Sequence, residues 1–116
     1  MPSNETITAH ELLYDLVPKL KATEATVSDT LTARLMMTTD PEVRERLKTF
    51  KAEFELERTM IRMNLEHLLR RHAEAVEAER SGNAGESRHT LPLDEHEATA
   101  VARVRQLYRR AQELKR

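Results

Sequence analysis

The chain has 116 residues, of which 34% are charged, with a net charge of −1 and no cysteine. The charged fraction exceeds the roughly 25% of an average globular protein, and the lack of cysteine excludes disulfides and thiolate chemistry. Neither a basic leader followed by an apolar stretch nor an apolar run of about 18 residues occurs. The sequence therefore predicts no membrane insertion and a cytoplasmic location.

The first predicted helix spans residues 8–38, after a disordered N-terminus of residues 1–7. Thr8 is a suitable N-cap, and Glu11 follows three positions on, which is the spacing of a capping box. Pro18 lacks an amide proton and clashes with the preceding turn, so the helix either kinks there or divides into two segments. The apolar pattern keeps its phase across the proline, which favours one kinked helix.

The second predicted helix spans residues 41–80 and contains no glycine. Asp40 is a suitable N-cap, and Pro41 falls at the first helical position. At 1.5 Å per residue such a helix is roughly 60 Å long, whereas a compact domain of this size has a diameter of roughly 35 Å. The short connection forces the two helices into a long antiparallel, coiled-coil-like hairpin, in which facing residue numbers sum to about 78.

This second helix is apolar on two sides. One side carries the main stripe, and Leu56, Met60 and Met63 lie nearly opposite it. Because the first helix covers only one side, the other side needs the third helix or the same surface of another chain. The pattern predicts an interaction surface at these three residues and a homodimer that forms a four- or six-helix bundle.

Residues 81–93 hold both glycines of the chain and are predicted to be a flexible linker, followed by a basic amphipathic helix over residues 94–116. Asp94 and Glu97 again have capping-box spacing. Six basic side chains on this helix could bind a phosphate backbone: Arg103, Arg105, Arg109, Arg110, Lys115 and Arg116. Since helix C-termini favour cations in any case, nucleic-acid binding is the alternative interpretation of this helix and not the first.

Glu24 lies at the centre of the first helix's apolar stripe, and the expected register places it near Arg58. A buried carboxylate without a partner is costly, so the sequence predicts a Glu24–Arg58 core pair, within one chain or across a dimer, that sets the helix register. Anion binding around Glu24, Arg58 and Arg62 is the corresponding enzyme-class alternative.

No metal, cofactor or catalytic site is predicted. A di-iron bundle needs two Glu-x-x-His pairs on helices, but the one such pair here, Glu86–His89, falls in the linker. His67 and His72 are five residues apart and so point to different sides of their helix. With no phosphate-binding or dinucleotide-binding glycine motif either, the sequence predicts an all-α, non-enzymatic interaction module, such as a scaffold, adaptor or regulatory subunit.

Overall fold

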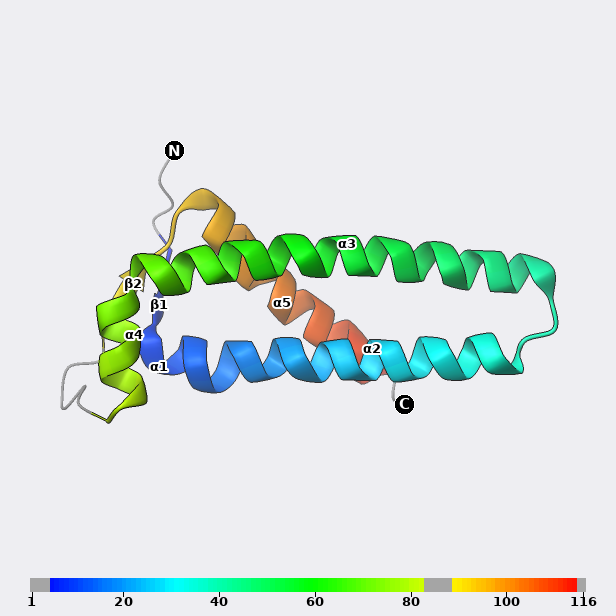
Figure 1. Cartoon of the computed structure of the whole chain (residues 1–116), viewed down its shortest axis with the longest axis horizontal. Helices are drawn as coiled ribbons and strands as arrows, with labels where there is room; N and C mark the ends of the chain where they lie inside the picture. Colours follow the sequence, from blue (N-terminus) through cyan, green and yellow to red (C-terminus); the bar gives the residue numbers. More distant parts are fainter. Residues whose placement is uncertain (1–4, 83–88, 115–116) are drawn as a thin grey trace.

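Helices make up nearly all of the structure, a computed structural model that describes residues 5–82 and 89–114 (Figure 1). The predicted all-α class is confirmed. In chain order the elements are β1 (Thr6–Thr8), α1 (Ala9–Glu11), the π-helical turn η1 (Leu12–Leu16), α2 (Val17–Met37), α3 (Pro41–Arg71), α4 (Ala73–Arg80), β2 (Thr90–Pro92) and α5 (Glu95–Leu114). The molecule is elongated, with extents of 56 × 31 × 20 Å.

Two short strands join the N-terminal segment to the segment before α5. β1 and β2 pair antiparallel, with Ile7 opposite Leu91, and both of these side chains are buried. The predicted disorder of residues 1–7 is therefore wrong at residues 6 and 7, and the predicted linker 81–93 is wrong at residues 90–92. Residues 1–4 and 83–88 lie outside the described residues. Each strand has only one buried side chain, so the alternation of buried and exposed residues that marks a strand in a sequence is too short to recognise here.

Helical structure then continues from α1 to the end of α2. The N-cap prediction is confirmed, because the Thr8 hydroxyl accepts a hydrogen bond from the backbone N–H of Glu11 at 3.0 Å. Before the proline the helix widens into η1, where the N–H of Val17 donates to the carbonyl of Leu12, five residues back. Pro18 follows at the start of α2. Helical structure is therefore unbroken across Pro18, and the wider turn falls in the residues just before the proline ring.

α3 begins where predicted and ends earlier than predicted. Asp40 caps it by accepting a hydrogen bond from the N–H of Glu42 at 2.9 Å. The helix stops at Arg71, because His72 leaves helical geometry with φ −120° and ψ 37°. The predicted single helix 41–80 is therefore wrong at residue 72, although residues 73–80 are helical again as α4. Instead α4 turns across the end of the molecule beside α1, where Val76 is buried (Figure 1). No glycine or proline marks this break, so tertiary packing decides it.

α5 lies across one face of the α2–α3 pair and contacts both helices (Figure 1). Its N-terminal half joins the main core at the end of the molecule that holds the strands, with Leu12, Leu16, Leu68, Leu91 and Val104 among the most buried side chains. Nearer the α2–α3 turn, a smaller cluster comprises Val27, Leu31, Phe54 and Ala111. From there to their turn, α2 and α3 are not covered by another helix of the described part of the chain (Figure 1).

Candidate functional site

Three large apolar side chains project from the middle of α3. The exposed fractions of Leu56, Met60 and Met63 are 65%, 58% and 63%. They follow one another at steps of four and three residues, which keeps them on one face of the helix. This set is called the apolar row below. Although α5 packs on α3, it leaves the row uncovered.

The apolar row borders a groove between α3 and α5. One hollow of about 320 Å³ is lined by Leu56, Met60, Ile61, Asn64, Thr99 and Ala100, together with Glu53, Glu57 and Arg103. A second hollow of about 280 Å³ shares these last three residues and continues past Phe50, Phe54, Leu107, Arg110 and Ala111 to Val27. The ion pair between Glu57 and Arg103 links α3 to α5 at the boundary of the two hollows. The groove is thus apolar at its base and charged at its rim.

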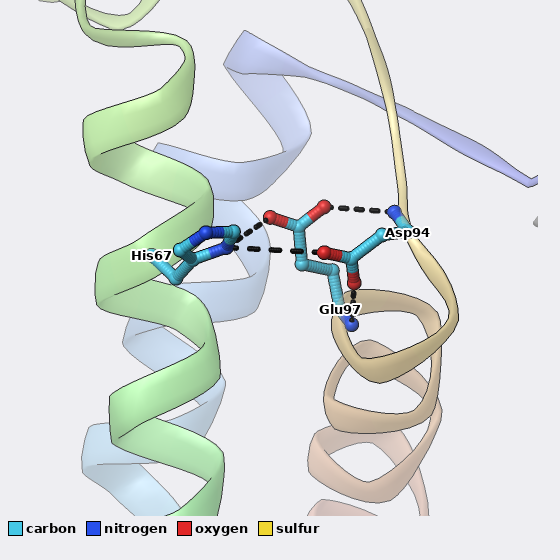
Figure 2. A group of neighbouring side chains, drawn as sticks. All are labelled: His67, Asp94 and Glu97. Atoms are coloured by element: carbon cyan, nitrogen blue, oxygen red, sulfur yellow. Dashed lines mark hydrogen bonds and ion pairs between the residues drawn. The ribbon is translucent and has the colours of Figure 1, made fainter. Parts of the chain in front are cut away.

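At the N-terminal end of α5, a buried carboxylate joins this helix to α3, and Figure 2 shows its contact with His67 of α3. Glu97 is fully buried, and both of its oxygens accept hydrogen bonds from Arg71: 2.5 Å from Nη2 to Oε1 and 3.2 Å from Nε to Oε2. Oε1 also accepts from the backbone N–H of Asp94, and Oε2 lies 3.0 Å from Nδ1 of His67. In return Asp94 accepts from the N–H of Glu97 at 2.7 Å, which confirms the predicted capping box. No pattern in the sequence predicts the contacts that Glu97 makes with His67 and Arg71 of α3.

Electrostatics favour the ionised form of Glu97. Burial alone would raise its pKa, but hydrogen bonds from Arg71, from the Asp94 backbone and from His67 lower the pKa below the ordinary glutamate range. The same hydrogen bond to Glu97 raises the pKa of Arg71. The two groups therefore stay charged together and hold the start of α5 against α3.

The depressed pKa of Glu97 predicts a loss of stability in acid. Because the folded pKa lies below the unfolded value, the unfolded chain binds more protons as the pH falls, and the contribution of Glu97 disappears as the pH passes through the folded pKa. Urea unfolding of the wild type and of Glu97→Gln between about pH 7 and pH 3 should show the stability difference shrinking toward the acid end. A difference that is constant over this range would contradict the charged network.

The same residues could be taken for a metal site. One ligand atom from each of His67, Asp94 and Glu97 lies within 4.8 Å of the others (Figure 2). However, the guanidinium of Arg71 already binds both oxygens of Glu97, and the N-terminus of α5 adds further positive charge. Both disfavour a divalent cation, so the cluster is best explained as a structural junction between α3 and α5.

The predicted partner of Glu24 is wrong by one helical turn. Glu24 accepts hydrogen bonds from Nε and Nη2 of Arg62 at 3.0 and 2.7 Å, whereas Nε of Arg58 is buried without a partner in the described part of the chain. Thr38 and Asp40 have extended backbones, so α3 begins beyond the end of α2 and the register is shifted (Figure 1). Since Arg62 already neutralises Glu24, the pair offers little net charge to an anion.

The basic side chains of α5 are divided among different surroundings. Arg103 pairs with Glu57 and Arg105 pairs with Glu11, so both are neutralised within the chain. Arg109 and Arg110 are exposed. Lys115 and Arg116 lie outside the described residues. The described part of α5 therefore presents a weaker cationic surface than the sequence indicates.

In the described residues no helix is both long enough and apolar enough to cross a membrane. Comparison with known proteins adds no functional information: no protein-family model matches the chain, and neither do curated proteins or solved structures.

Proposed function

We propose that the protein is a non-enzymatic interaction module that self-associates through the apolar row of α3. The observation that supports this function most strongly is the exposure of Leu56, Met60 and Met63 beside an apolar groove. Exposed single apolar side chains are common on soluble proteins, but a continuous row at helical spacing is typical of surfaces that pack against another helix.

The partner that best fits the apolar row is a second copy of the same chain. Long amphipathic helices with a thin internal core gain stability by burying apolar faces against one another, and homodimers are the commonest soluble oligomers. A dimeric helical bundle with coiled-coil-like packing of α3 follows from this arrangement. Such an assembly would act as a scaffold, adaptor or regulatory subunit through the helical surfaces that remain exposed.

Light scattering coupled to size-exclusion chromatography tests this proposal. The wild type should elute at twice the monomer mass, and Met60→Glu should give the monomer mass because a carboxylate would be buried without a partner. Ala25→Glu is the matched control, since Ala25 is exposed on α2, and it should remain dimeric. A monomeric wild type, or a Met60→Glu variant that is still dimeric, would overturn the proposal.

A further inference from the structure

The methionines of the described chain all lie on its surface. The exposed fractions of Met36, Met37, Met60 and Met63 are 81%, 83%, 58% and 63%. Methionine is ordinarily among the residue types that are most often fully buried. Here leucine, isoleucine, valine, alanine and phenylalanine supply the buried side chains of both hydrophobic clusters. The four thioethers are therefore open to reagents in solution.

These thioethers are also the sulfur groups that an oxidant would modify. The chain has no cysteine, so no thiol competes for the oxidant. A hydroperoxide transfers one oxygen atom to the methionine sulfur: the O–O bond breaks, an S–O bond forms, and the peroxide leaves as water or an alcohol. The sulfur is oxidised by two electrons and the peroxide is reduced by two. The reaction replaces an apolar thioether by a polar S=O acceptor without changing the charge.

The methionines occupy two places on the molecule. Met60 and Met63 are two of the three members of the apolar row, and Met60 also lines the hollow beside α5. Met36 and Met37 end α2, and α2 lies on the other side of α3 from the row. Consecutive helix positions differ by about 100°, so Arg62, which bonds to Glu24 of α2, points nearly opposite to Met60. Oxidation at the two places therefore alters different surfaces.

We infer that Met60 and Met63 form a modification site for hydroperoxides, and that their oxidation dissociates the proposed dimer; this inference rests on the proposed self-association. The apolar row binds a second copy by removing apolar surface from water. A sulfoxide that is buried there without a hydrogen-bond donor loses its hydration with no compensation. A two-fold interface contains each modified position twice, which doubles the effect.

Self-association controls the reaction in return. A second copy covers the apolar row, so peroxide reaches Met60 and Met63 only in the dissociated chain, whereas Met36 and Met37 stay accessible. Oxidation of Met60 and Met63 should therefore slow down as the protein concentration rises, and oxidation of Met36 and Met37 should not. Oxidant thus converts a reversible dissociation into a lasting one until the sulfoxides are reduced.

Hydrogen peroxide is the probe, with peptide mass spectrometry to locate the added oxygen atoms and light scattering to give the mass of the same sample. Wild type oxidised at all four positions should elute as a monomer, which corresponds to a rise of at least about tenfold in the dimer dissociation constant. The double variant Met60→Leu, Met63→Leu keeps an apolar row without sulfur and should stay dimeric after the same treatment. The matched control, Met36→Leu with Met37→Leu, should dissociate as the wild type does.

The outcomes separate this inference from the proposed function. Oxidised wild type that stays dimeric with sulfoxides at Met60 and Met63 would overturn the modification site and leave self-association standing, whereas an untreated wild type that is monomeric would end both. Reduction by the two methionine sulfoxide reductases, one for each epimer, should restore the dimer. Failure to restore it, or equal dissociation of the Met60→Leu, Met63→Leu variant, would place the damage elsewhere in the chain and overturn the inference.

Discussion

Replacing Glu97 by alanine is expected to lower the free energy of unfolding by about 3 kcal/mol. The substitution removes a buried carboxylate that accepts hydrogen bonds from Arg71 and from the Asp94 N–H and that contacts Nδ1 of His67. It also removes half of the capping box at the start of α5. Arg71 is 38% exposed, so it can regain water, which keeps the loss below the upper end of the range for a broken buried pair.

Equilibrium unfolding in urea measures this loss, with Glu113→Ala as the control. Glu113 is an exposed glutamate on the same helix, so its replacement should change stability by less than about 0.5 kcal/mol. A domain of this size has a total stability of roughly 6–17 kcal/mol, and the Glu97 variant should therefore lose a substantial share. A loss under about 1 kcal/mol would show that α5 is held mainly by its apolar contacts.

The second large effect is expected for Leu68→Ala, which should cost about 3 kcal/mol. Leu68 is fully buried in the main core, so shortening it removes apolar burial and leaves a cavity. Leu69→Ala removes the same atoms from the next position, where the side chain is only partly buried, and should cost about 1 kcal/mol. Thermal or urea unfolding of both variants at equal protein concentration checks the difference, and equal losses would contradict the observed packing of α3.

Much of the helical architecture could be predicted because its signals are local. Thr8, Asp40 and Asp94 each cap a helix as predicted, since the hydrogen bond of an N-cap lies within three residues of it. The exposure of the apolar row also agrees with its predicted position opposite the main stripe. These features depend on neighbouring residues along one helix, which the sequence displays directly.

The remaining features depend on contacts between distant segments. The end of α3 at Arg71 has no breaker residue, and it follows from the packing of α4 and from hydrogen bonds that Arg71 and His72 make with the carbonyl of Pro92. Glu24 pairs with Arg62 and not with Arg58 because the backbone geometry of the turn between α2 and α3 sets the register of the two helices. Likewise, the junction at Glu97 joins side chains that are 26 and 30 residues apart.

The pairing of β1 with β2 has a consequence for the order of folding. It joins residues 6–8 to residues 90–92, so it closes a loop that holds every helix except α5, whereas the helices need only local contacts. Chain closure over such a span comes after the intervening segments have become compact. We therefore expect the two strands to assemble last and to open first, so that their amides exchange with solvent sooner than those of the central helices.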